Sequence, residues 1–320
     1  MPVIGLGTWK SPLGKTGAAV KVALESGYRC LDTANDYANE AEIGEALQDV
    51  FAKGDLKRSD IFIQSKLWNS NHRPEHVRAD LEATLRDLQT DYVDSFVIHW
   101  PQVCTMFPIE ADGKYSSDNE SHYVDTWHAM EELVDAGLVR TIGLSNFNRR
   151  QVAEVQAAAR KYQPTILQNE CHPYLQNKDL IDFCQRTGVQ FQSYSPLGSY
   201  DRPWAQPGEP ELLEDPRLKE IGARHGNKTT AQVVLRWHIQ RGTAACPKSV
   251  TPARIESNFQ VFDFELTPED MAVLSDMNMG WRHLLWDATA MHPDYPFKDD
   301  LPHDHVVPDA PMNTSHSSRN

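Results

Sequence analysis

Short apolar segments alternate with longer amphipathic segments along most of the chain. The apolar segments have the length of buried strands and are bounded by turn residues, which is typical of a sheet covered on both faces. They span residues 28–31, 61–68, 92–100, 140–145, 164–170, 188–195, 243–248 and 259–264. Between them the spacing is helical; in residues 74–88, for example, Val77, Leu81, Leu85 and Leu88 share one face.

The order of these elements predicts a barrel. Strict alternation of strands and helices requires parallel strands joined by crossover helices, and about eight such units in roughly 250 residues match a (β/α)8 TIM barrel. A doubly wound open sheet is the alternative, but it usually has fewer strands, and no Gly-x-Gly-x-x-Gly follows an early strand here. Residues 1–9 are apolar and broken by glycines, and we expect part of an N-terminal hairpin there.

No change in composition marks a domain boundary before the C-terminus. We therefore expect residues 1–300 to form a single (β/α)8 barrel domain. Residues 301–320 are rich in Pro, His, Asp and Ser, and we expect a polar tail that is poorly ordered.

Charge and cysteine content exclude several classes of partner. The net charge of the 320 residues is -14, which disfavours binding to nucleic acid or to anionic membranes. An anionic ligand must then be held by a local basic cluster. The five cysteines are scattered and form no Cys-x-x-Cys pair, which is typical of reduced thiols in a cytoplasmic protein. No segment approaches the ~20 apolar residues of a membrane helix.

Polar side chains stand where the predicted strands end. In a barrel these ends meet over one mouth, where catalytic residues gather. Taken singly, each could serve structure alone, but together they predict a functional site because the strands themselves are apolar. The residues at the strand ends are Asp32, Lys66, Trp68, His99, Trp100, Ser145, Asn146, Gln168, Glu170, Tyr194, Ser195, Lys248 and Ser249.

Three of these polar groups, together with Tyr37 in the loop after Asp32, suggest reduction of a carbonyl. Lys66 facing Asp32 would stay charged and would move the pKa of Tyr37 down toward that of a usable proton donor. Tyr37 would then be the general acid for a carbonyl oxygen, which His99 would orient. No metal-ligand spacing or nucleophile elbow is present, so we expect no metal site. Because the set holds no reductant, the hydride must come from a cofactor.

Residues 246–254 predict where that cofactor binds. Thr251 and Pro252 are suited to the start of a helix, whose free N–H groups attract phosphate. Lys248 and Arg254 add two cations, which suggests an extra phosphate such as the 2′-phosphate of NADP. An ordinary capped helix with solvated charges is the alternative.

Four motifs resemble those of one known family. They are residues 27–34 (Gly-Tyr-Arg-Cys-Leu-Asp-Thr-Ala) with Tyr37, and residues 139–147, 170–174 and 247–255. In this order the chain resembles the aldo-keto reductases over nearly its whole length, most closely the aldose and aldehyde reductase branch. The resemblance implies a barrel, NADPH/NADP+ as cofactor, and reduction of aldehydes and some ketones.

The resemblance also implies the roles of individual residues. The catalytic residues would be Asp32, Tyr37, Lys66 and His99. The cofactor would be bound by Gly7, Thr8, Trp9, Lys10, Asp32, Ser145, Asn146, Gln168, Tyr194, Ser195, Leu197, Ser199, Asp201, Lys248, Ser249, Val250, Thr251, Arg254 and Asn258. The substrate would contact Trp9, Tyr37, Trp68, His99, Trp100, Trp204, Leu284 and Trp286, the last two in a C-terminal substrate loop over residues 280–294. Asp201 could latch the loop after residue 195 to Lys10 or Lys248.

We therefore expect a monomeric NADPH-dependent reductase acting on a small-molecule carbonyl substrate. Relatives also include lens crystallins and channel-associated subunits. The alternative function is accordingly a cofactor-binding barrel with a structural or regulatory role and little turnover.

Overall fold

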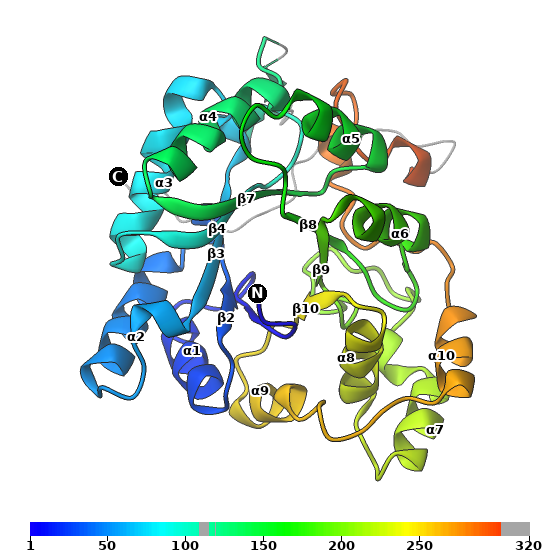
Figure 1. The fold of residues 1–320 in the computed structure, drawn as a ribbon. Helices are drawn as coiled ribbons and strands as arrows, with labels where there is room; N and C mark the ends of the chain where they lie inside the picture. The colour runs from blue at the N-terminus through cyan, green and yellow to red at the C-terminus, as the bar shows by residue number, and fades with distance from the viewer. Residues whose placement is uncertain (109–114, 119, 302–320) are drawn as a thin grey trace.

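The computed structural model describes residues 1–108, 115–118 and 120–301. Within them, eight strands form one sheet in which all neighbouring strands are parallel. In sheet order they are β1 (Leu6–Gly7), β2 (Cys30–Asp32), β3 (Phe62–Leu67), β4 (Val93–Ile98), β7 (Val139–Ser145), β8 (Ile166–Glu170), β9 (Gln190–Tyr194) and β10 (Ala244–Cys246). Parallel bridges from Ile4 to Ala245 and from Gly7 to Lys248 join the two edges. The predicted (β/α)8 barrel is confirmed (Figure 1).

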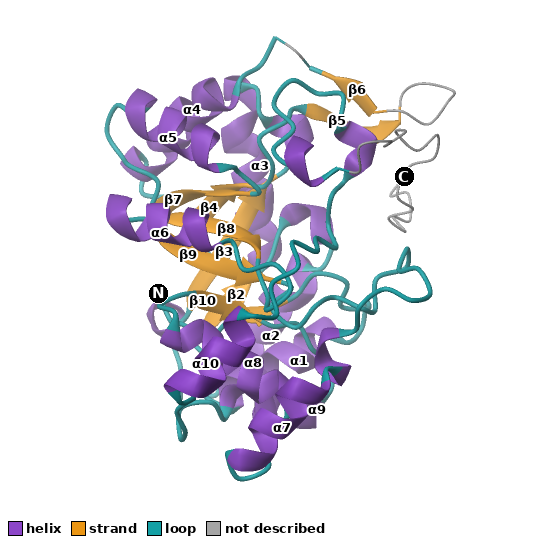
Figure 2. Cartoon of the chain, turned by 90° about the vertical axis from the view of Figure 1, so that its right-hand side faces the viewer, coloured by secondary structure: helices purple, strands orange, loops and turns teal. Residues whose placement is uncertain are grey.

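Helices surround the strands (Figures 1 and 2). The α-helices of the described residues are α1 (Thr16–Glu25), α2 (Glu40–Ala52), α3 (Pro74–Leu88), α4 (Tyr123–Asp135), α5 (Arg149–Ala158), α6 (Lys178–Thr187), α7 (Pro216–Arg224), α8 (Thr230–Gln240), α9 (Pro252–Phe259) and α10 (Pro268–Ser275). Local chemistry sets several starts, because Asn148, Thr229 and Thr267 each accept the N–H three residues later in a capping box. No helix in these residues is both long and apolar enough to cross a bilayer.

The N-terminal segment is a barrel strand, so the hairpin prediction is wrong. Strand β1 pairs in parallel with β2, and Gly7 N donates to Pro247 O at 3.0 Å. The glycines that suggested a loop permit this close packing. A Cβ on Gly7 would lie 2.8 Å from the carbonyl oxygen of Cys246. No side chain fits there without displacing backbone.

The strand expected over residues 259–264 is also absent from the structure. Phe259 ends α9, and residues 260–266 contain no strand. Val261 and Leu266 are buried in the main apolar core, where they pack without pairing in the sheet. Their apolar spacing therefore reflects burial on the outside of the barrel, since β1 already fills the place beside β10.

Long excursions leave the barrel at its C-terminal end. Strands β5 (Cys104–Pro108) and β6 (Tyr115–Ser117) pair antiparallel beyond β4. The segment that follows α10, residues 276–301, reaches the barrel mouth, because Leu284 and Trp286 line a cavity there. In Figure 2 the N-terminus lies at the left of the barrel, and the long loops extend to the right. Of the predicted tail 301–320, all residues after 301 lie outside the described residues, and the 1–300 domain limit stays a prediction.

Candidate active site

Asp32, at the end of β2, holds three side-chain donors on one oxygen. Its Oδ1 accepts Lys66 Nζ at 2.8 Å, Gln64 Nε2 at 2.9 Å and Gln168 Nε2 at 2.7 Å. Lys66 Nζ also donates to Thr33 O at 2.7 Å, and its side chain is 1% exposed. Neighbouring parallel strands thus fix a buried ammonium at the mouth of the barrel, where a charge is tolerated only because it is paired.

Tyr37 and His99 lie next to this ammonium. Tyr37 ends a short 3-10 helix (Asn35–Tyr37) after β2, and Lys66 Nζ lies 4.8 Å from the centre of its ring. His99 follows β4, and its ring centre is 5.8 Å from that of Tyr37, edge to face. The four residues predicted to be catalytic therefore come together at one wall of the barrel mouth.

The pKa of Tyr37 moves in the direction opposite to our expectation. Burial, reinforced by the charge of Asp32, raises the pKa of the Tyr37 phenol well above its usual value of 10.0. The expectation neglected that Asp32 already balances the charge of Lys66 and itself disfavours a phenolate. Burial, followed by the charge of Lys66, lowers the pKa of His99 well below 6.5. At neutral pH the site holds a protonated phenol and a neutral imidazole.

Aromatic rings enclose the space above these groups. Trp286 stacks on Trp68 with ring centres 5.5 Å apart and meets Trp100 edge to face at 5.2 Å. Trp68 also lies edge to face with His99 at 5.2 Å. Trp286 comes from the C-terminal loop, so the apolar wall is shared between strand ends and a segment that follows the last helix.

A second polar group lies beside this wall. Asn146, after β7, has a left-handed backbone with φ 61°. Its Nδ2 donates to His99 O at 2.9 Å, and its Oδ1 accepts the Tyr194 hydroxyl at 2.6 Å. These bonds fix the plane of the Tyr194 ring next to the cavity, where it can stack against a flat group.

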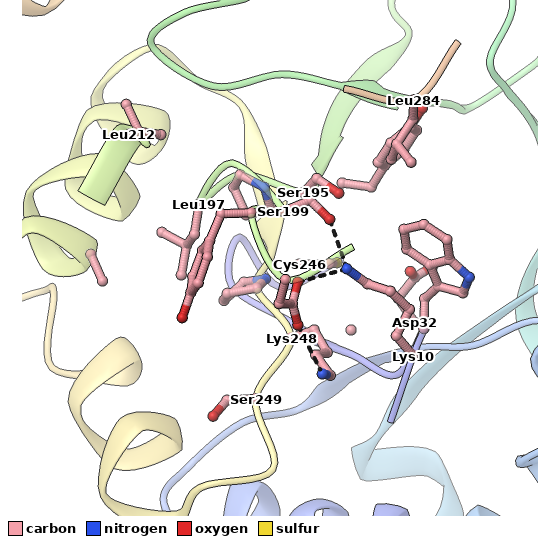
Figure 3. Close-up of a pocket in the computed structure, with 18 of the residues that line it drawn as sticks. Lys10, Asp32, Ser195, Leu197, Ser199, Leu212, Cys246, Lys248, Ser249 and Leu284 are labelled. Carbon is pink, nitrogen blue, oxygen red and sulfur yellow. Dashed lines mark hydrogen bonds and ion pairs between the residues drawn. The ribbon is translucent and has the colours of Figure 1, made fainter. Parts of the chain in front are cut away.

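Two lysines, Lys10 and Lys248, hold the loop after β9 against the cavity. Lys10 Nζ donates to Ser199 Oγ at 2.9 Å and to Asp201 Oδ1 at 2.6 Å. Lys248 Nζ lies 3.5 Å from Asp201 Oδ2. Figure 3 shows Lys10 reaching toward this loop, with dashed lines marking its contacts. The sequence predicted one lysine or the other as the partner of Asp201; the structure has both.

The far end of the cavity is basic and opens at the start of α9. Ser249 Oγ accepts Thr251 N at 3.1 Å, while Thr251 stands at the N-cap without making a side-chain cap bond. Arg254, in the first turn, is exposed and has no acidic partner within the described part of the chain. A guanidinium without an acidic partner in these residues suits a phosphate.

One cavity of about 740 Å³ joins these regions. Of the residues predicted for the site, Lys66, Thr8 and Glu170 are absent from its described lining. Lys66 lies buried behind Tyr37, and the Thr8 hydroxyl donates to Asp32 O at 3.0 Å. In Figure 3, Leu212 and Leu284 lie on opposite sides of the cavity.

Sequence reasoning missed part of the basic end. The cavity is also lined there by Glu211 to Glu214, by Thr229 to Ala231 and by Ser257. The start of α8 at Thr229 was a readable signal, because its capping box marks a helix start with free N–H groups. Glu211 to Glu214 follow a long loop, and nothing local indicates that this loop returns to the cavity.

Comparison with known proteins agrees with this arrangement. Residues 3–278 match the model of the Aldo/keto reductase family. The chain is 48% identical over 313 residues to Aldo-keto reductase family 1 member A1 of Gallus gallus, covering 93% of this chain and 95% of that protein. The corresponding Homo sapiens protein is 46% identical over 313 residues, with the same coverage.

A solved structure gives the same result. The aldose reductase from Schistosoma japonicum superposes with a TM-score of 0.87 at 47% identity, covering 94% of this chain and 96% of that one. The matched region includes both the barrel and the segments around its mouth. The chain therefore belongs to the aldo/keto reductase family of oxidoreductases.

Proposed function

We propose that the protein is an NADPH-dependent reductase that converts aldehydes, and some ketones, to alcohols. The observation that carries the proposal is the position of Tyr37, stacked over the Lys66 ammonium and beside His99 in an aromatic pocket. Bound NADPH would supply the hydride. The chain must then bind the cofactor, orient the carbonyl and deliver one proton to its oxygen.

Tyr37 is the proton donor in this proposal. Burial raises the pKa of Tyr37 well above its usual value, so the phenol keeps its proton at neutral pH and gives it up only to a more basic oxygen, such as the alkoxide that forms as hydride reaches the carbonyl carbon. His99, neutral because burial lowers its pKa, is placed to donate a hydrogen bond to the same carbonyl oxygen. Lys66 stabilises the negative charge that develops on the phenol as its proton leaves.

The basic end of the cavity fits the adenosine phosphates of NADPH. Lys248 and Arg254 supply two cations there, in a chain that is otherwise acidic. The predicted contacts of Ser249, Thr251 and Asn258 belong to the same end. We assign Tyr194, Asn146, Ser145 and Gln168 to the nicotinamide because they line the same cavity as Tyr37 on or directly after β7, β8 and β9, and because the Tyr194 ring can stack against a flat group.

The pocket wall favours carbonyl compounds with an apolar body. Relatives carry the names aldo-keto reductase and aldose reductase, and we extend that activity class to this chain. The wall of Trp9, Trp68, Trp100, Trp204, Leu284 and Trp286 offers few polar partners for a substrate far from its carbonyl. A monomeric state and a cytoplasmic location stay predictions.

The test is the loss of NADPH absorbance with a panel of aldehydes, aldoses and ketones. Wild-type protein should turn over aldehydes, and Tyr37→Phe should bind NADPH normally but lose turnover by about 10²- to 10⁴-fold. Quenching of tryptophan fluorescence measures binding independently. Binding of NADPH without turnover of any substrate would favour the alternative, a barrel with a structural or regulatory role. Near-normal activity in Tyr37→Phe would overturn the assignment of the acid.

A further inference from the structure

The carboxylate of Glu170 is wholly buried, and most of its bonds go to a remote loop. Glu170 ends β8, with both oxygens turned to the C-terminal segment. Its Oε1 accepts His283 N at 2.8 Å, and its Oε2 accepts Leu284 N at 2.9 Å. His172 Nε2 makes the remaining contact, 2.9 Å from Oε1. A buried carboxylate thus takes up two consecutive backbone amides of a loop more than a hundred residues away.

The residues after these amides form part of the pocket wall. Leu284 lines the cavity directly, and Trp286, two residues later, stacks on Trp68. Glu170 itself is absent from the described lining of the cavity. The position of the wall therefore depends on a group that lies behind it.

The same cluster also lies close to the loop after β9. His283 Nε2 is 3.8 Å from the point where a Cβ on Gly198 would lie. Gly198 has φ +88°, a left-handed conformation that favours glycine. The anchored segment is thus packed between β8 and the loop that Lys10 and Lys248 latch over the cavity.

Positive groups keep Glu170 ionised in spite of its burial. Burial alone raises the pKa of the carboxyl, but the hydrogen bond and charge of His172, together with Arg282, bring it down to about 2. Hydrogen bonds to an ionised acceptor are the stronger kind, of about 1.5–3 kcal/mol each. At neutral pH the two amides are therefore bound by an ionised carboxylate.

We propose that Glu170 is a positioning residue: by binding the amides of His283 and Leu284, it fixes the substrate-facing wall at Leu284 and Trp286 and so sets which carbonyl compounds fit. The effect on substrates rests on the proposed function above. The effect on the loop does not, because the two hydrogen bonds exist without any ligand.

The same cluster could also be considered as a metal site. Ligand atoms of Glu170, His172 and His283 all lie within 4.8 Å of one another. However, Trp281 Nε1 donates to His283 Nδ1 at 3.1 Å, and burial lowers the pKa of His283 to about 4. The neutral ring must then carry its proton on Nε2, which leaves that nitrogen no lone pair for a metal; it is buried and makes no hydrogen bond with the described residues. The hydrogen-bonded anchor agrees with this tautomer, and a metal does not.

A matched control is present elsewhere in the barrel. Glu131, in α4, is also buried, and its Oε1 accepts the backbone amides of Arg160, Lys161 and Tyr162 at 2.9, 2.6 and 2.9 Å. Glu131 does not line the cavity. Glu131→Gln therefore reports the cost of weakening a buried carboxylate-to-amide anchor at a distance from the substrate.

The experiment compares Glu170→Gln, Glu170→Ala and Glu131→Gln by hydrogen exchange and kinetics. In both Glu170 variants the amides of residues 283 and 284 should exchange at least ~10-fold faster than in wild type. The KM for bulky aromatic aldehydes should rise several-fold, while kcat for a small aldehyde and the affinity for NADPH stay unchanged. Glu131→Gln should alter exchange only at residues 160–162. If Glu170→Gln does not fold, Glu170→Asp keeps the charge and should give an intermediate result.

Each outcome decides between the two roles. Unchanged exchange at residues 283 and 284 in a folded Glu170→Gln variant would overturn the anchor. Faster exchange at residues 283 and 284 in Glu131→Gln as well would show that general destabilisation, and not loss of the anchor, causes the effect. An effect of EDTA or Zn²⁺ on wild-type exchange that matches the effect of Glu170→Gln would favour the metal instead. If wild type shows no turnover at all, the proposed function fails, whereas the exchange measurement still tests the anchor.

Discussion

Lys66 Nζ lies 2.8 Å from Asp32 Oδ1, with the two side chains 1% and 6% exposed. This ion pair sits beneath the Tyr37 ring, which Lys66 Nζ approaches to 4.8 Å from its centre. Lys66 is therefore held in place by a carboxylate on the neighbouring strand and presents its charge to a phenol. Breaking one half of a buried pair is costly because the other charge stays buried.

Asp32→Asn should destabilise the protein and stop turnover. The variant leaves the Lys66 ammonium buried without its counter-charge, and we expect a loss of about 3–5 kcal/mol in the free energy of unfolding. Asp32→Asn combined with Lys66→Met should recover part of that stability but none of the turnover, because the charge near Tyr37 is gone. Urea unfolding and steady-state kinetics measure the two effects separately. A single variant as stable as wild type would show that the pair is not desolvated.

Arg254→Ala should weaken NADPH far more than NADH. Arg254 has no acidic partner within the described residues, so its charge is free for the 2′-phosphate. A charged hydrogen bond of about 1.5–3 kcal/mol corresponds to roughly 10- to 150-fold in Kd. Lys248→Ala should have a smaller effect because Lys248 also pairs with Asp201. Fluorescence titration with both cofactors provides the measurement, and equal losses for NADH would remove the phosphate role.

Asp201→Asn should speed the release of NADPH. Asp201 holds Lys10 at 2.6 Å and Lys248 at 3.5 Å, but its side chain is 46% exposed, so each contact is partly screened. We expect a change of about 2- to 10-fold in the dissociation rate by stopped-flow fluorescence. The exposed Lys21–Asp49 pair, 2.7 Å apart on the helices outside the barrel, is the control. Asp49→Asn should leave the rate unchanged, and a similar acceleration there would refute the latch.

His72→Leu should reduce the loss of stability that the protein shows as the pH falls. Both ring nitrogens of His72 are buried without a hydrogen-bond partner in the described residues, and burial, followed by His292, lowers its pKa to about 3. Below pH 6.5 His72 is protonated in the unfolded chain but stays neutral in the folded chain. The free energy of unfolding therefore falls as the pH falls. The slope is ~1.4 kcal/mol per pH unit until the folded group titrates.

Thermal unfolding between pH 7 and pH 4 tests this effect. His72→Leu should be as stable as wild type or more stable at pH 7, because the orphaned polar group is removed. Its slope with pH should be shallower by about one proton. His76→Leu, on an exposed face of α3, is the control for substitution alone. Parallel curves for wild type and His72→Leu would contradict the prediction.

Local sequence patterns were enough to identify much of the site. Asp32, His99 and Gln168 follow apolar strands, and strand ends of a parallel barrel share one mouth, so position along the chain was enough to group them. The phosphate-binding segment was equally readable, because Pro252 and the cations around it mark a helix start. The sequence did not identify two of the strands correctly: it missed β1 and predicted a strand over residues 259–264. Strand β1 (Leu6–Gly7) has only two residues, which is too short to show any periodicity.

The sequence by itself determined the class of fold and the chemistry, since hydrophobic periodicity and the side chains at strand ends are local properties. Only the tertiary structure decided the direction of the Tyr37 pKa, because that depends on how deeply the phenol is buried and on Asp32 beside it. It also decided what Glu170 holds. Backbone amides carry no side-chain signal, and those of His283 and Leu284 reach Glu170 across 113 and 114 residues only when the barrel closes.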